Sequence, residues 1–482
     1  TVRYTFVLIN HAETTKTHTS TLPDDMPFSD EQPSLQRLQA VGGRRVMKNV
    51  SVLLGGRAIN APLSLVHIWL ATHLLGSHGF GLVAMMYAFA RTMSDLVDFQ
   101  SWQTVLKYGL HPLTDGDFSG FQRVVAFSFL LDGIGGLTGC IGGITISLSG
   151  MTLLGWPPEI HVIGVIFCVS ILFMASATPT GLLSVFNRYD LISIQGVAAT
   201  IVRVIGTAVL TFTGASVMAL ATVWILAEVV AWATLSVMAL RELMRRNLIR
   251  GLPTELWKLL PDLANGFFFR THPGIRRFAL ATNLNSALAL TFNHIGTLVV
   301  GAYAGPASAG YCRIASQIAS GIAKPASIIQ TTVYPEMARL WREHAMTRLY
   351  RLTFQVALAA GGIGTCLLIA TLLAGKPLLQ LYIGYSGAVQ TLPVILWLLA
   401  AEVVAVWGLP LEPLLFTTNR SGAATSVRLL DCLVFFPGLV LVVRRYGLDG
   451  VGPMTLLGVT LLIGLQLFLV LRTPTLRTAN GL

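Results

Sequence analysis

Residues 48–109 read KNVSVLLGGRAINAPLSLVHIWLATHLLGSHGFGLVAMMYAFARTMSDLVDFQSWQTVLKYG, two long apolar runs separated by a short glycine-containing turn. Each run, about 49–73 and 80–106, is long enough to cross a hydrocarbon core of about 30 Å, which takes about 20 helical residues. The runs are continuous and lack period-2 alternation, so they favour helices over the strands of a transmembrane barrel. This stretch therefore predicts a pair of transmembrane helices.

The same pattern recurs along almost the whole chain. The 482 residues are 54% hydrophobic and only 11% charged, with a mean hydropathy of +0.68. Because an ordinary soluble protein carries about 25% charged residues, composition alone indicates a membrane protein. Ten further apolar runs follow the first two, at 121–148, 159–185, 191–213, 216–239, 278–303, 308–332, 349–374, 388–416, 422–443 and 450–471. We therefore predict an all-α polytopic membrane protein with twelve transmembrane helices.

The basic residues divide unevenly between the two sides of this topology. One side receives most of the arginines and lysines outside the helices, whereas the other receives Lys376, Arg444 and Arg445. The positive-inside rule then places both termini in the cytoplasm. The net charge of +11 follows from this topology, so it predicts no nucleic-acid partner, although basic loops also favour anionic lipid surfaces.

An internal repeat relates the two halves of the chain. Gly76 and Gly81, which follow the first helix, match Gly305 and Gly310 at an offset of 229. An Asn-Arg pair after the fourth helix recurs after the tenth, displaced by 232. Each half holds six predicted helices, and an even number keeps both halves in the same orientation. The repeat is therefore predicted to be a parallel one, of the kind that transporters use.

The domain boundaries follow from these spans. The first 48 residues are polar and predict a disordered tail. The stretch PTELWKLLPDLANGFFFR (253–270) looks amphipathic and predicts a surface helix in a linker, with a regulatory binding site as the weaker alternative. The predicted order is a cytoplasmic tail (1–48), a six-helix bundle (49–239), a cytoplasmic linker (240–277), a second six-helix bundle (278–472) and a cytoplasmic tail (473–482).

Six basic residues lie within the apolar segments: Arg57, Arg91, Arg203, Arg313, Lys324 and Arg428. A charge near the bilayer centre costs roughly 2.5–3.5 kcal/mol on insertion scales, so such residues usually face a water-filled cavity or a partner. The clearest polar stripe is in the eighth helix, where steps of three, four and seven place Arg313, Ser316, Gln317, Ser320 and Lys324 on one face.

Polar stripes on the first, second, seventh and eighth helices would meet across the repeat axis. They predict a central cationic cavity between the two bundles. The residues expected to bind substrate in this cavity are Arg57, Asn60, Arg91, Arg313, Gln317, Lys324, Asn283 and Asn293.

Charge pairing within the membrane is the structural alternative. The spacing of Arg91–Asp95 and of Arg428–Asp431 allows intrahelical pairs, and Arg203 could pair with Glu228 of the adjacent helix. No acid lies within one turn of Arg57, Arg313 or Lys324, so the cavity interpretation is favoured for these three. The intramembrane acids are also candidates for coupling to an ion: Asp95, Asp132, Glu228, Glu402 and Asp431. His67 and His294 are expected to be polar helix contacts rather than proton carriers.

No catalytic or cofactor motif is evident. The sequence has no P-loop, GxSxG or HExxH motif and no Cys/His metal spacing, so we expect a protein that is not an enzyme, holds no cofactor or metal and does not use bound ATP. The five cysteines fall within predicted helices and form no CxxC pair, which favours buried hydrophobes over disulfides or a metal site.

Residues 48–109 resemble the opening two helices of the polysaccharide biosynthesis flippases, in which a helix is followed by an LG-x-x-x-FG turn, here Leu75 to Gly81. The segment VYPEMARLW (333–341) is similar to the Pro-Glu-x-x-x-Leu ending of that family's eighth helix. These Wzx-type proteins belong to the superfamily of lipid II flippases and multidrug and toxic-compound extrusion transporters. The resemblance spans roughly residues 45–472.

The resemblance implies a function. Members move an oligosaccharide linked to undecaprenyl pyrophosphate across the bacterial cytoplasmic (inner) membrane, for O-antigen, capsule or exopolysaccharide synthesis. A cationic cavity takes the pyrophosphate and sugar while the lipid tail stays in the bilayer, and Arg57, Arg91 and Arg313 occupy regions where the family carries functional arginines. The implied protein partners are a polysaccharide polymerase and a chain-length regulator. The two extra C-terminal helices of the lipid II branch are missing from the sequence, which argues against lipid II.

Three alternatives remain at this stage. A drug or metabolite exporter of the same fold would want a net acidic cavity for cationic substrates. A membrane polysaccharide polymerase or ligase would carry a sizeable outer loop, whereas every predicted outer connection is short. A membrane scaffold without transport activity would leave the buried charges without a purpose.

Overall fold

The computed structural model describes residues 35–153, 159–343, 345–418 and 420–472, and every regular element within these ranges is helical. Contacts divide the chain into one unit of residues 1–52 and another of residues 53–482, and the second unit carries the candidate site. The predicted all-α class is therefore confirmed for the described part of the chain.

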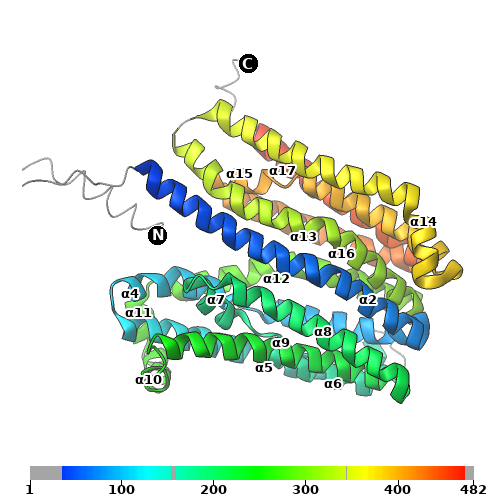
Figure 1. Ribbon diagram of the computed structural model, residues 1–482, viewed down its shortest axis with the longest axis horizontal. Coiled ribbons are helices and arrows are strands. Elements are labelled where there is room, and N and C mark those ends of the chain that lie inside the picture. Colours follow the sequence, from blue (N-terminus) through cyan, green and yellow to red (C-terminus); the bar gives the residue numbers. More distant parts are fainter. Residues whose placement is uncertain (1–34, 154–158, 344, 419, 473–482) are drawn as a thin grey trace, which may run out of the picture. The chain divides into compact units, whose positions relative to one another are not determined.

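The first half of the chain and the linker form eleven elements labelled in part in Figure 1. They are α2 (Leu35–Val97), α3 (Ser101–Thr104), the π-helical turn η1 (Val105–Gly109), α4 (Leu110–Thr114), α5 (Phe118–Leu153), α6 (Glu159–Met174), α7 (Ala177–Val185), α8 (Tyr189–Thr213), α9 (Val217–Arg245), α10 (Leu252–Ala264) and α11 (Phe267–Thr271).

The second half continues with long helices. They are α12 (Ile275–Ala304), α13 (Pro306–Arg342), α14 (Met346–Trp407), α15 (Leu411–Thr417), α16 (Ser421–Tyr446), the 3-10 turn η2 (Gly447–Gly450) and α17 (Val451–Leu471). Helix α8 packs against α9 and α5 against α6, while α13 packs along α14 and α14 along α17 (Figure 1).

Seven helical segments of the described chain are long and apolar enough to cross a membrane. They are Gly55–Thr114, Phe118–Ser149, Val162–Val185, Tyr189–Thr213, Val217–Arg245, Met346–Leu415 and Gly422–Leu471. Two of these contain a non-helical glycine, Gly76 in α2 and Gly384 in α14, where the sequence predicts a turn between two spans. The chain is thus a multi-pass membrane protein, while the count of twelve helices in two bundles stays a prediction.

Some predicted boundaries move. Helix α2 begins at Leu35, rather than near residue 49, because Leu, Gln, Arg and Ala at its start are good helix formers. The remainder of the predicted tail (1–34) and the C-terminal tail (473–482) lie outside the described residues. The predicted helix 80–106 is interrupted at residues 98–100, where Gln100 takes a left-handed φ of 49° and its N–H binds Asp98 Oδ1 at 2.9 Å.

The predicted helix 159–185 is interrupted as well, at Ala175 and Ser176 between α6 and α7. Pro179 explains this break, because a proline has no N–H to donate to the carbonyl of Ala175 four residues earlier. The N–H of Thr178, at the start of α7, is instead satisfied by Asp132 Oδ2 of α5 at 2.8 Å. A break therefore brings a carboxylate to the beginning of a helix.

Of the two glycine pairs matched by the repeat, one shares its backbone conformation and the other is in contact. Gly76 (φ 68°, ψ 178°) and Gly305 (φ 86°, ψ 169°) both lie in the left-handed region that only glycine adopts without strain. Five residues further on, Gly81 and Gly310 pack against each other, and a Cβ on Gly310 would lie 3.4 Å from Gly81 Cα. Backbones from the two halves thus meet at equivalent positions.

Two large apolar cores flank this contact. One is built mainly on α2, α6 and α9 around Phe80 and Trp224, and the other on α12 to α14, α16 and α17. Ile318 of α13 packs against both cores. Ile383 of α14 does the same, so α13 and α14 both share side-chain contacts between the two cores.

Candidate functional site

Tyr87 of α2 is the point at which charged side chains from both halves meet. Its ring is buried, 8% exposed, and Arg203 of α8 places its Cζ 5.1 Å from the ring centroid. Arg313 of α13 places its Cζ 5.6 Å from the same centroid. Both guanidinium groups lie within the distance at which a ring attracts a cation. With Arg91, one turn after Tyr87 on α2, they form what we call the arginine cluster.

Two members of the arginine cluster are ion-paired. Arg203 pairs with Glu228 of α9, and Tyr87 Oη donates to the same carboxylate oxygen at 3.4 Å. Arg91 Nε lies 3.2 Å from Asp95 Oδ1. Two of the three pairs that the sequence allows are therefore present. The Arg91 side chain is 32% exposed, so the described protein does not cover it completely.

Arg313 differs from the other two arginines. Within the described residues it forms no ion pair, and its electrostatic neighbours are Tyr87, Arg203 and Cys312. It comes from the C-terminal half, whereas Arg91 and Arg203 come from the N-terminal half. A cation whose charge is unmatched by the described acids is thus held beside a second cation across the junction of the halves.

The two histidines next to the cluster have structural surroundings. Trp224 Nε1 donates to His67 Nε2 at 3.0 Å, which requires that nitrogen to be unprotonated and the ring to be neutral. Trp224 also lies against Arg203, whose Cζ is 5.1 Å from its ring. His294 of α12 meets the Tyr87 ring edge-on at 6.3 Å. The contact of His67 agrees with the predicted polar helix contact.

The remaining predicted cavity residues take different positions. Arg57 is exposed on α2, and Gln317 is half-buried one turn after Arg313. The Asn60 carboxamide oxygen accepts a hydrogen bond from Thr200 of α8. Asn283 Nδ2 donates to the Asp98 carbonyl at 2.9 Å, at the break after α2.

The side chains of Lys324 and Asn293 lie outside the described residues. Of the eight residues predicted to bind substrate, the structure therefore brings Arg91 and Arg313 together and uses the amides of Asn60 and Asn283 to connect helices.

The five acids predicted to couple transport to an ion lie in different surroundings. Asp95 and Glu228 belong to the ion pairs of the arginine cluster, whereas Asp132 caps the start of α7. Glu402 is half-buried in α14. Asp431 is 3% exposed in α16, and its Oδ1 has no hydrogen-bond partner among the described residues.

The ion pair of Arg428 with Asp431, which the spacing allows, is not formed among the described residues. Arg428 Nη2 instead lies 3.0 Å from Glu412 Oε2, because α15 packs against α16 and presents its acid to the arginine.

A small polar cavity lies where the two interrupted helices meet. Asp98 and Asp132 line it together with Ser94, Gly136 and Ala175, and its volume of about 10 Å³ suits one water-sized occupant. The hydroxyls of Ser101 and Thr178 are buried nearby without a hydrogen-bond partner in the described chain. Two carboxylates and two hydroxyls thus gather where two helices are interrupted, which is the kind of position where transporters place ion sites.

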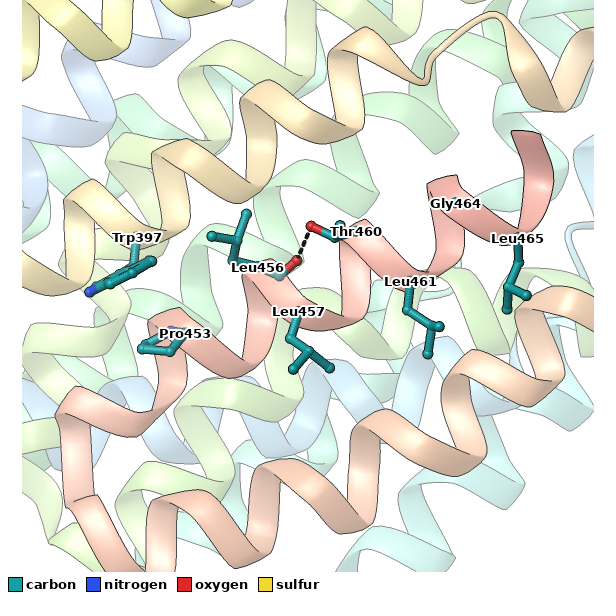
Figure 2. Close-up of a pocket in the computed structure, with 8 residues that line it drawn as sticks. All are labelled: Trp397, Pro453, Leu456, Leu457, Thr460, Leu461, Gly464 and Leu465. Atoms are coloured by element: carbon teal, nitrogen blue, oxygen red, sulfur yellow. Dashed lines mark hydrogen bonds between the residues drawn. The ribbon is translucent and has the colours of Figure 1, made fainter. Parts of the chain in front are cut away.

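An apolar groove of about 600 Å³ runs along α17 (Figure 2). Leu457 and Leu461 line it on α17, and Trp397 of α14 closes one end, as the sticks in Figure 2 show. Leu457 is 55% exposed and Trp397 44% exposed. A groove of this composition on an apolar membrane helix fits a hydrocarbon chain rather than a polar ligand.

Comparison with known proteins assigns the chain to a family. The family model described as "Polysaccharide biosynthesis protein" matches residues 46–341, more than half of the chain. The chain belongs to this family. It is also 30% identical over 341 residues to the "Inner membrane protein YghQ" of Escherichia coli (strain K12), which covers 71% of this chain and 93% of that protein.

Solved structures of transporters share the fold. An inward-facing multidrug resistance MATE family transporter of the MOP superfamily aligns with a TM-score of 0.67 at 15% identity, over 89% of this chain and 99% of that one. The lipid II flippase MurJ in an inward closed conformation aligns with a TM-score of 0.63 at 12% identity, over 88% of each chain. The family member described here thus has a MATE- and MurJ-like transporter fold.

Sequence inspection missed Tyr87 and Trp224 as parts of the site. Tyr87 precedes Arg91 by four residues and so shares its helical face, a signal that was available. Trp224 carries no such signal, because it reaches the cluster only through the packing of α9 against α2.

Proposed function

We propose that this member of the family is a flippase for an oligosaccharide linked to undecaprenyl pyrophosphate, which it moves across the bacterial inner membrane for surface polysaccharide synthesis. The observation that supports it most is Arg313, held beside Arg203 and Tyr87 without an acid among the described residues. Guanidinium groups bind phosphate oxygens in a bidentate fork, and a pyrophosphate takes several such donors at once.

The proposed mechanism assigns each part of the substrate to one environment. The pyrophosphate binds at the arginine cluster, where Arg313 supplies charge and Arg91 and Arg203 can exchange their carboxylates for phosphate oxygens. The lipid tail stays in the bilayer, and the apolar groove along α17 is a candidate path for it. The two halves then rock about the site, which opens it to one side of the membrane and then to the other.

Arg313 is the residue that tests this proposal. Arg313→Ala in proteoliposomes should lower the flipping of a labelled undecaprenyl-pyrophosphate oligosaccharide by about 10- to 100-fold, because a charge-assisted hydrogen bond contributes about 1.5–3 kcal/mol. Arg313→Lys should retain part of the activity. Arg444→Ala, which removes an exposed arginine at the end of α16, serves as the matched control. Full activity of Arg313→Ala would remove the arginine cluster from the mechanism.

A drug or metabolite exporter is the second candidate, favoured by the fold shared with MATE transporters. The same vesicles distinguish the two, because an exporter would move a cationic fluorescent drug and would ignore the lipid-linked sugar. The ion pairs of Asp95 and Glu228 weaken this candidate, since both acids are already matched by arginines.

The small cavity at the helix breaks supports a coupling role for Asp132. We infer that binding and release of a proton or a small cation at Asp132 are coupled to the movement of the substrate across the membrane. The proposed orientation keeps both termini in the cytoplasm, and a polysaccharide polymerase and a chain-length regulator are the proposed partners. Labelling of single cysteines at the two ends with membrane-impermeant reagents tests the orientation, and labelling from outside the cell would contradict it.

A further inference from the structure

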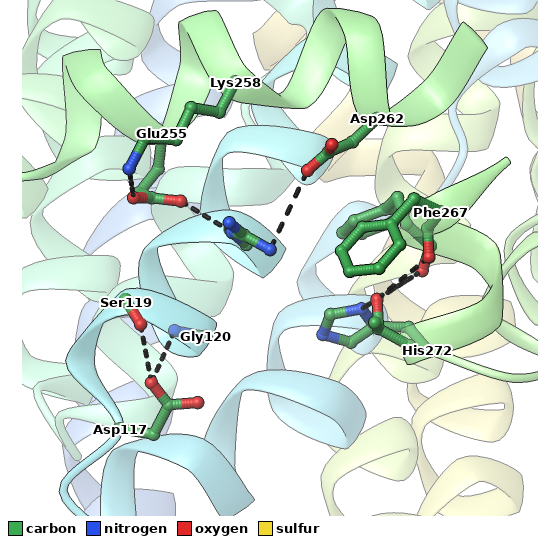
Figure 3. Close-up of polar contacts among 11 residues, drawn as sticks. Asp117, Ser119, Gly120, Glu255, Lys258, Asp262, Phe267 and His272 are labelled. Carbon is green, nitrogen blue, oxygen red and sulfur yellow. Dashed lines mark hydrogen bonds and ion pairs between the residues drawn. The ribbon is translucent and has the colours of Figure 1, made fainter. Parts of the chain in front are cut away.

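Helix α10 is amphipathic, and its two acidic side chains are turned inward beside the buried Leu259. Arg123 of α5 bonds through Nε to Glu255 Oε2 at 2.6 Å and lies 3.8 Å from Asp262, and Lys258 donates to Glu255 at 2.9 Å (Figure 3). The Glu255 side chain is only 8% exposed. Burial alone would raise the pKa of Glu255, but the hydrogen bonds from Arg123 and Lys258 outweigh it and hold that pKa below its ordinary value.

One part of the apolar face of α10 is turned outward, whereas Leu259 of the same helix is buried. Trp257 is 77% exposed, Leu260 51% and Leu256 41%, and these three lie within about 100° of one another around the helix. Phe267, at the start of α11, extends the surface at 48% exposure. A contiguous exposed surface of large apolar side chains on a helix marks a place that contacts something apolar.

The position of α10 indicates what that contact is. The helix is held by Arg123, which lies in the first turns of the apolar segment Phe118–Ser149, and α11 packs Phe268 against Phe127 of the same segment at 4.8 Å. The exposed side chains therefore lie at the level where a membrane-spanning helix begins, which is the boundary between lipid and water. Tryptophan is the residue typical of this boundary.

The positive charge around this surface favours anionic lipids. Exposed basic residues adjoin α10 and α11 in the chain: Arg250, Arg270, Arg276 and Arg277. The two acids of α10 are matched by Arg123 and Lys258. We propose that α10 and α11 form an interfacial anchor that binds the anionic phospholipid surface through Leu256, Trp257, Leu260 and Phe267. The anchor lies between α9 and α12, so it would fix the segment that joins the two halves at the membrane, whatever substrate is carried.

The test uses the full chain in lipid nanodiscs, with its five native cysteines replaced and one cysteine introduced for a bimane label. Trp257→Cys reports on the anchor, and Leu260→Cys is the second position if the first variant does not fold. Asp115→Cys, in the exposed turn between α4 and α5 near the same end of α5, is the control. Nitroxide-labelled phospholipid and iodide are the lipid-borne and water-borne quenchers, in bilayers with and without phosphatidylglycerol.

In anionic bilayers we expect nitroxide lipid to quench position 257 at least about threefold more than position 115, with iodide showing the reverse order. Arg270→Gln and Arg277→Gln should weaken the effect of anionic lipid, each by about fivefold in binding. Quenching of position 257 by iodide as strong as at position 115 would overturn the proposal, and would leave the surface to a protein partner absent from the nanodisc. Equal lipid quenching in neutral and anionic bilayers would overturn its charge component.

Discussion

Replacement of Gly81 by alanine should push the two halves apart at the contact between Gly81 and the start of α13. Gly81 packs backbone to backbone against the start of α13, and its added Cβ would lie 1.8 Å from the Pro306 carbonyl oxygen. The obstacle is main chain, so no side-chain rotation relieves it. In the reverse direction, a Cβ on Gly310 would lie 2.8 Å from the Ser77 carbonyl oxygen.

The size of the effect follows from this overlap. The Cβ–oxygen distance must grow from 1.8 Å to at least about 3.0 Å, so the helices have to separate. Overpacking of this kind costs typically about 1–3 kcal/mol. If the halves part at this contact during transport, the same free energy shifts the population toward the parted state by about 5- to 150-fold.

Distance measurements between two spin labels by double electron–electron resonance can detect this shift in population. Spin labels at His78→Cys and Tyr303→Cys, both exposed near the contact and on opposite halves, should report a larger fraction of long distances in Gly81→Ala. Gly133→Ala is the matched control, because a Cβ there would meet no atom within 4 Å. Helix propensity alone would make that control neutral or slightly stabilising.

The reasoning fails if Gly81→Ala gives the same distance distribution as Gly133→Ala. In that case the helices at the glycine contact would have room for a methyl group. The contact between Gly81 and α13 would then play no part in the movement of the halves.

Three further expectations concern other sites. Asp132→Asn keeps an acceptor for the N–H at the start of α7 while removing the charge, so thermal stability should persist and the ion dependence of transport should disappear; retained ion dependence would contradict the coupling proposal. Trp224→Phe leaves the buried His67 Nε2 without its donor, which should cost about 1–3 kcal/mol and lower the melting temperature seen by size-exclusion thermostability; an unchanged melting temperature would argue that water replaces the donor. The pKa of Glu255 lies below its ordinary value of 4.5, so its ion pairs stabilise the docked α10 above that pH and are lost as pH falls further; hydrogen exchange of α10 should rise below about pH 4.5, and Glu255→Gln, which should exchange fast at every pH, checks the assignment.

The helical class and two of the buried ion pairs were predictable from the sequence for a simple reason. Continuous apolar runs of this length have one stable form in lipid, and a charge spaced by one turn or placed on a neighbouring helix has few partners to choose from. Arg91–Asp95 and Arg203–Glu228 follow from these constraints.

Arg428 shows where such constraints end. Spacing allows a pair with Asp431, but it does not decide between that acid and one delivered by another element, and packing of α15 brings Glu412 instead. The role of Tyr87 was hidden for a similar reason. Its helical face is predictable, whereas the arrival of Arg203 and Arg313 depends on how three distant helices pack.

Orientation is the second limit. The sequence shows that residues 253–270 are amphipathic, yet it does not show which face is turned inward, because that depends on Arg123, far away in the chain. Equivalence of Gly81 and Gly310 is likewise visible as an offset. Their contact requires that the two segments pack side by side, which an offset does not encode.

The position of Arg313 affects how readily the protein changes conformation without a bound substrate. Arg313 has no ion-paired acid among the described residues, so an empty protein pays the cost of burying this charge when its halves close around the cluster. An anionic substrate would supply a counter-ion for Arg313 and remove this cost. Leak through unloaded turnover would then be suppressed by electrostatics alone. Inorganic pyrophosphate should therefore narrow the spin-label distances between α8 and α13, and an unchanged distribution would contradict this account.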